Sequence, residues 1–71
     1  MSGHEIEEGD RIGRFLVFRD IDGRLHGIAA GAVNAVCEGE DGGVLMLSGG
    51  RLLHVERSLA TVLAWLDGRG P

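Results

Sequence analysis

The fold is decided by residues 44–66, which read VLMLSGGRLLHVERSLATVLAWL. A short apolar run opens this stretch and is followed by Ser48-Gly49-Gly50, residues typical of a tight turn because glycine tolerates positive φ. In the next run, 51–56, Leu53 and Val55 alternate with the other side chains and share one face. Residues 44–56 therefore predict a pair of antiparallel strands.

The same stretch ends in the clearest helix of the chain. Ser58 is a good N-cap, because its hydroxyl can accept a hydrogen bond from a free backbone N–H group. Gly68 is placed to end the helix, since glycine readily adopts the left-handed conformation that follows a last helical turn. Apolar residues recur between them at helical spacing, and those expected to face the sheet are Leu59, Val62, Leu63 and Leu66.

An earlier hairpin is predicted upstream. The run 14–19 is short, aromatic and β-branched, and it is followed by Asp22-Gly23, a strong hairpin signal. Residues 24–29 are the expected return strand. Residues 30–38 stay open, because their apolar alternation fits a strand while their alanine content allows a short helical turn.

Together these elements predict an α+β fold: a small antiparallel sheet of four or five strands with one C-terminal α-helix packed on one face. The 71 residues make a single domain, which we place at residues 12–71. Residues 1–11 are polar and acidic, and we expect them to form a flexible N-terminal segment. A core this small is marginal and usually needs a disulfide, a metal or a second subunit.

The predicted helix carries no charge between Arg57 and Asp67. An exposed helix on a small domain normally has charged residues on its outer side. Here the outer side is expected to hold Ala60, Thr61, Ala64 and Trp65. One interpretation is an interface with a partner or a second copy, which would give a homodimer anchored by the tryptophan. The alternative is that the tryptophan folds back onto the sheet edge and the alanines are inert.

Acidic residues outnumber basic ones by 11 to 7, for a net charge of −4. With two Phe, one Trp and no Tyr, the chain lacks both the basic surface and the stacking platform of a nucleic-acid binder. Glu38, Glu40 and Asp41 cluster in a loop that the sheet should hold at both ends. They are our candidates for docking on a basic surface of a protein partner, although such residues are often only solubilising.

No catalytic, cofactor or metal motif is present in the sequence. The only cysteine, Cys37, is interpreted as a small buried apolar residue, while a thiol–imidazole pair with His26 or His54 stays open. Zinc-binding spacing and a phosphate-binding loop are both missing. We therefore expect a protein that binds rather than catalyses, with no catalytic residue, cofactor or metal.

The sequence has no membrane or export signal. No apolar run approaches the roughly 20 residues that span a bilayer. The first residues lack a basic region followed by an apolar one. A lone thiol fits a reducing interior, so we expect a cytoplasmic protein.

From Val44 onward the chain resembles the small FlbD/SwrD-type flagellar proteins. The likeness rests on a strand, a turn ending in Gly50, a second strand and a helix started by Ser58, and an Asp22-Gly23 turn corresponds to the family's Asn-Gly turn. It covers residues 15–66 and implies a small non-enzymatic accessory protein. The family's helix is charged, whereas this one is not, and the acidic N-terminal segment is also a departure.

Three function classes follow. The first is an acidic inhibitor or adaptor that docks on a larger protein complex, such as one that handles nucleic acid. Phage-encoded anti-CRISPR proteins have this general character of short, acidic, motif-free chains. The second is a flagellar or motility accessory protein, and the third is a thiol-dependent enzyme that uses Cys37.

Overall fold

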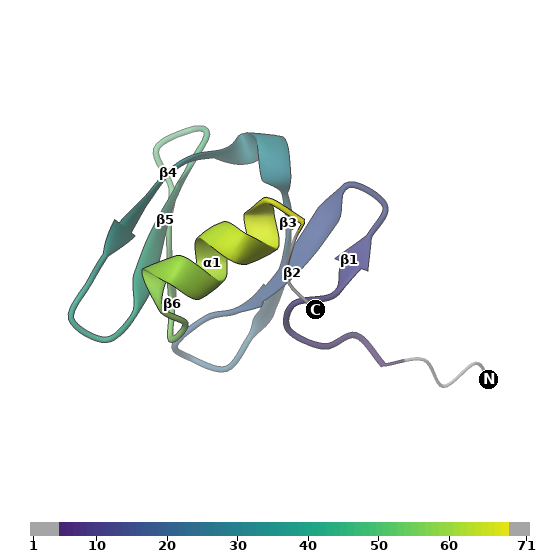
Figure 1. Cartoon of the computed structure of the whole chain (residues 1–71), viewed down its shortest axis with the longest axis horizontal. Helices are drawn as coiled ribbons and strands as arrows, with labels where there is room; N and C mark the ends of the chain where they lie inside the picture. The colour runs from purple at the N-terminus through teal and green to yellow at the C-terminus, as the bar shows by residue number, and fades with distance from the viewer. Residues whose placement is uncertain (1–4, 69–71) are drawn as a thin grey trace.

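The computed structural model describes residues 5–68. Its elements are, in chain order, β1 (Arg11–Ile12), β2 (Phe15–Arg19), β3 (Leu25–Ala29), the short 3-10 helix η1 (Ala30–Ala32), β4 (Val33–Glu38), β5 (Gly43–Leu47), β6 (Leu52–Val55) and α1 (Leu59–Leu66). The strands form two three-stranded antiparallel sheets, ordered β1-β2-β3 and β4-β5-β6, and α1 lies across the space between them (Figure 1). The predicted α+β class, with antiparallel strands and one C-terminal helix, is confirmed.

The prediction of a single sheet of four or five strands is wrong, because the chain turns a corner after β3. There η1 separates β3 from β4, so these two strands lie at the edges of different sheets. The sheets meet instead where Asp20 forms an isolated bridge with Val55, and where Ile21 N donates to His54 O at 3.1 Å. Residues 30–38, left open between strand and helix, contain both a helical turn and a strand.

The core lies between the two sheets and the helix. Leu45 on β5 pairs with Leu53 on β6, and both side chains point inward. Leu53 and Val55 are buried together, as the alternation of this run predicts. The buried cluster comprises Leu16, Phe18, Leu45, Leu47, Leu53, Val55 and Val62, so each sheet and the helix contribute to it.

Helix α1 begins and ends where the sequence predicts. The Ser58 side chain accepts a hydrogen bond from Thr61 N, and Gly68 has a φ of 78° just after the last turn. The predicted inner face is only partly right. Val62 is fully buried, but Leu63 is 49% exposed. Trp65 packs on the core in its place, because its larger ring reaches the aromatic ring of Phe18.

The acidic N-terminal segment, expected to be a flexible tail, makes hydrogen bonds and an ion pair with the domain from Glu8 onward. Gly9 N donates to Val17 O at 2.8 Å, and Val17 N donates to Asp10 O at 2.9 Å. Glu8 forms an ion pair with Arg57 at 2.8 Å. These contacts lead directly into β1, which pairs with β2, whereas residues 1–4 lie outside the described part of the chain.

Candidate functional site

The loop between β4 and β5 is held rigidly at both ends, as the sequence predicts. Gly39 N donates to Gly42 O at 2.6 Å, and Gly43 N donates to Arg57 O at 2.8 Å. Gly42 has a φ of 147° and lies directly against β6, where a Cβ atom would sit 2.2 Å from Val55 O. Only glycine fits at this position, so the backbone of the loop is fixed against the sheet.

Three carboxylates of this loop have no partner in the described part of the chain. Glu38, Glu40 and Asp41 are exposed, and none of their carboxylates makes a hydrogen bond or ion pair with another residue described. Glu38 and Glu40 line a hollow of about 280 Å³ together with Glu56 and the first residues at the N-terminal end of α1. We call Glu38, Glu40, Asp41 and Glu56 the acidic end of the molecule.

Glu56 was missed by the sequence analysis, although a signal for it existed. It directly follows β6, and the pairing of Gly43 with Val55 brings that strand end beside the loop. Its neighbour Arg57 forms its ion pair with Glu8, outside the acidic end. The hydrogen bonds that Arg57 donates to Glu8 raise the pKa of Arg57, and the charges of Glu8 and Glu56 raise it further.

The candidate residues on the helix separate into two groups. Ala60 is exposed, whereas Thr61 and Ala64 are half-buried. The Trp65 ring lies 6.0 Å from the Phe18 ring, and the Arg57 guanidinium stands 5.8 Å above it. The tryptophan thus packs inward beside Gly9 of the N-terminal segment, against the central strand β2 and not on the sheet edge that the alternative interpretation names.

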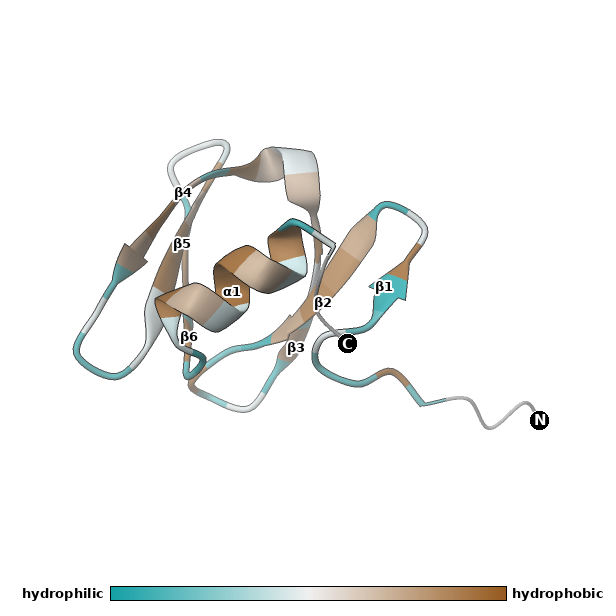
Figure 2. Cartoon of the chain, viewed as in Figure 1, coloured by the Kyte–Doolittle hydropathy of each residue, from teal (hydrophilic) through white to brown (hydrophobic). Residues whose placement is uncertain are grey.

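What remains outside on the helix is apolar and uncharged. Ala60 and Leu63 are the exposed apolar side chains of α1, and Figure 2 shows the helix in brown and tan. Leu59 lines the hollow of the acidic end, so the structure brings the first turn of the helix, but not Trp65, to the loop. The candidate surface is therefore the acidic end with the adjoining first turns of α1.

A second uncharged surface, missed in the sequence, is the outer face of β4-β5-β6. Cross-strand pairing places Ala35, Met46 and Leu52 in one row, and the row beside it holds Cys37, Val44 and His54. Leu52 is 55% exposed and Met46 is 41% exposed. The solvent side of an antiparallel sheet is usually polar. We call these six residues the outer sheet face; the signal for it was the lack of polar residues at alternate positions of Val44-Leu45-Met46-Leu47.

The expectation that Cys37 is buried is wrong, because it belongs to this exposed face. Its Sγ lies 3.8 Å from Met46 Sδ. His54 stands two strands away in the same row, and His26 belongs to the other sheet. The described residues therefore form no thiol–imidazole pair, and they contain no group of three or more His, Cys, Asp or Glu that could hold a metal ion.

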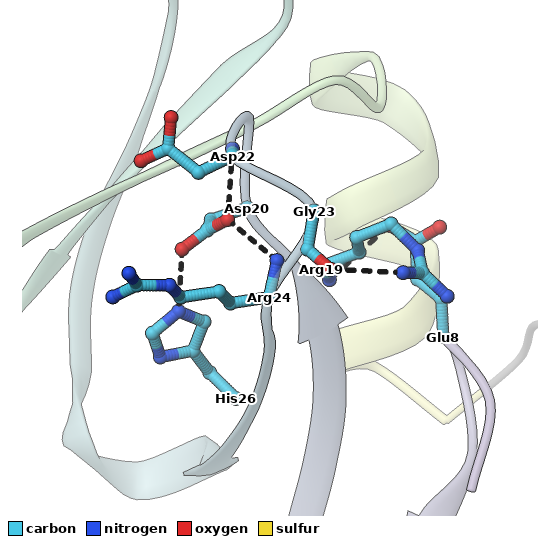
Figure 3. A network of polar contacts seen from close by, with 7 residues as sticks. All are labelled: Glu8, Arg19, Asp20, Asp22, Gly23, Arg24 and His26. Atoms are coloured by element: carbon cyan, nitrogen blue, oxygen red, sulfur yellow. Dashed lines mark hydrogen bonds and ion pairs between the residues drawn. The ribbon is translucent and has the colours of Figure 1, made fainter.

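The polar network around Asp20 closes the β2–β3 hairpin (Figure 3). Asp20 Oδ1 accepts hydrogen bonds from the backbone N–H groups of Asp22 and Arg24, both at 2.9 Å, while Oδ2 lies 2.7 Å from His26 Nε2. The hydrogen bond with His26, followed by that from Arg24, lowers the pKa of Asp20. Every acceptor bond of this carboxylate is made within its own hairpin, which indicates a structural role.

No protein-family model, curated protein or solved structure matches the chain. In the part of the chain described, no helix is both long and apolar enough to cross a membrane.

Proposed function

We propose that this chain is a small non-enzymatic protein-binding module, an acidic inhibitor or adaptor that docks on a larger protein complex in the cytoplasm. The observation that carries the proposal is the rigid loop that presents Glu38, Glu40 and Asp41 without partners among the described residues. A loop that is already ordered loses little conformational entropy on binding. Its charges would guide the approach to a basic partner and select against acidic ones.

The chemistry of the proposed partner follows from what surrounds the loop. Glu56 adds a fourth carboxylate beside the hollow, and the first turn of α1 adds Leu59 and Ala60. A matching partner has arginine or lysine side chains next to an apolar strip. The nucleic-acid-binding surface of a larger complex has the required charge, and covering it would inhibit that complex in the manner of anti-CRISPR proteins.

A second candidate, an accessory protein of the flagellum, is supported by the order of elements at the C-terminal end. Strand β5, a glycine turn, β6 and a helix capped by Ser58 follow one another as the resemblance implies. Both candidates are binding functions. The separation of Cys37 from both described histidines, His26 and His54, supports binding over thiol catalysis.

Charge reversal tests the proposed docking. The partner is first captured from nuclease-treated lysate and identified, and its association is then measured with purified components at several salt concentrations. We expect the triple variant Glu38→Arg, Glu40→Arg, Asp41→Arg to bind at least about a hundredfold more weakly. Its association rate should also lose the salt dependence of the wild-type protein.

The matched control reverses three exposed acids elsewhere, Glu5, Glu7 and Asp22. This control changes the net charge by the same amount but leaves the acidic end intact. If the two triple variants weaken binding equally, net charge alone matters and the acidic end is not the docking site. If neither has an effect, the docking mechanism is wrong.

A further inference from the structure

The outer sheet face is the second unusual surface of the molecule, because it is exposed and yet largely apolar. None of its six residues is Asp, Glu, Lys or Arg; they are Ala35, Cys37, Val44, Met46, Leu52 and His54. Ile21 extends the face past β6, since its N–H donates to His54 O, and it is 53% exposed. An apolar sheet surface of this kind normally marks an interaction site.

We propose that a second copy of this chain covers the outer sheet face, which gives a homodimer of two stacked sheets. The face carries an exposed apolar side chain at one end and a hollow at the other. At one end lies Leu52, which is more exposed than Met46, the other large apolar residue of its row. At the other end Ile21, Val44 and His54 line a hollow of about 240 Å³. A two-fold dimer uses the same patch on both subunits, so a projection and a hollow on one patch can engage twice.

Charge selects the orientation of the two sheets. Asp41 lines the hollow at one end of the face, and Arg51 precedes Leu52 at the other end. Neither side chain forms an ion pair with another described residue. A two-fold axis across the strands places Asp41 of each copy near Arg51 of the other, whereas an axis along the strands places like charges together. We therefore infer antiparallel stacking, with Leu52 of one copy at the hollow of the other.

The face competes with the helix as a dimer surface, and the structure favours the sheet. On the helix, Trp65 packs inward against Phe18, which leaves Leu63 as the one large apolar side chain exposed on α1 within the described residues. The sheet offers a continuous patch. The dimer engages Asp41 and covers the hollow that Glu40 also lines, whereas Glu38 and Glu56 lie on the helix side of the acidic end and stay accessible for the proposed docking.

The dimer is tested on the purified full chain, without any partner, so its failure is independent of the docking proposal. Molecular mass is measured by sedimentation equilibrium over a wide concentration range. The face contributes seven side chains, fewer than the roughly 20–30 residues per partner of a standard interface, so we expect dissociation in the micromolar range. Leu52→Glu should raise the dissociation constant at least about tenfold, because it places a charge in the apolar contact.

Leu63→Glu is the matched control, because Leu63 is 49% exposed against 55% for Leu52. It should leave the dimer unchanged, and circular dichroism checks that both variants are folded. A charge swap tests the orientation: Asp41→Arg or Arg51→Asp alone should weaken the dimer, and the double variant should recover it. Absence of this recovery would overturn the antiparallel arrangement.

Cys37 supplies a second readout, since it is the only cysteine and is exposed in the single chain. Its rate of alkylation by a maleimide should fall as the wild-type concentration rises, and it should stay constant in Leu52→Glu. A strict monomer at several hundred micromolar would overturn the proposal. So would a dimer that Leu63→Glu dissociates and Leu52→Glu does not, because that result assigns the interface to the helix.

Discussion

Gly42→Ala should destabilise the protein more than any other glycine substitution in a described turn. The added Cβ would lie 2.2 Å from Val55 O and 2.9 Å from Glu56 Cα. Both are backbone atoms of a paired strand end, so they cannot rotate away as a flexible side chain could. The residue also has a φ of 147°, which L side chains rarely adopt.

The magnitude follows from these two effects. A positive φ costs about 1–2 kcal/mol for a residue with a Cβ atom. Overpacking against a fixed neighbour adds about 1–3 kcal/mol. We therefore expect a loss of about 2–5 kcal/mol in the free energy of unfolding, a large part of the roughly 4–11 kcal/mol available to a domain of this length. The melting temperature should fall by roughly 10–30 °C.

Gly49→Ala is the matched control, because it also lies in a Gly-Gly pair at a turn. Gly49 has a φ of 87°, but no atom lies within 4 Å of its added Cβ. Only the cost of the positive φ applies, about 1–2 kcal/mol. Urea unfolding followed by circular dichroism measures both variants. If Gly42→Ala is no less stable than Gly49→Ala, the close approach of the loop to β6 does not hold in solution.

Three further predictions concern other parts of the chain. Ser58→Ala should cost about 1 kcal/mol in urea unfolding, since it removes the acceptor of the Thr61 N–H bond. The lowered pKa of Asp20, caused first by the His26 hydrogen bond, contributes stability that is present above the unfolded value near 3.8 and is lost as pH falls through the folded-state pKa. The stability difference between the wild-type protein and Asp20→Asn, measured by urea unfolding, should therefore shrink below about pH 4. Cys37→Ala should keep both fold and partner binding; loss of activity in a folded variant would favour a thiol enzyme.

The hairpins and the helix could be predicted because their signals lie within a few residues. Asp22-Gly23 forms the turn between β2 and β3, and the Gly49-Gly50 turn joins β5 to β6. The Ser58 hydroxyl caps α1 through the third residue after it. Each of these interactions connects neighbours in the chain, so local chemistry alone determines it.

The candidate site could be predicted only in part, because only some of its contacts join neighbours in the chain. The acidic residues of the β4–β5 loop are evident in the sequence. The attachment of this loop at both ends follows from its position between two predicted strands. The meeting of the loop with Glu56 and the first turn of α1 required the pairing of β5 with β6 and the path of the chain beyond it. Contacts between separate segments depend on the whole fold and leave no local pattern.

Only the tertiary structure decided which apolar side chains are covered. In Val44-Leu45-Met46-Leu47 both faces of the strand are apolar, so alternation cannot tell the inner face from the outer one. The corner at η1 splits the strands into two sheets, and that division leaves Cys37 and Met46 outside. The position of Trp65 against Phe18 turns Leu63 outward. Local sequence thus determined the strands, turns and helix. Long-range packing determined which apolar faces are buried, because a small core cannot hold all of them.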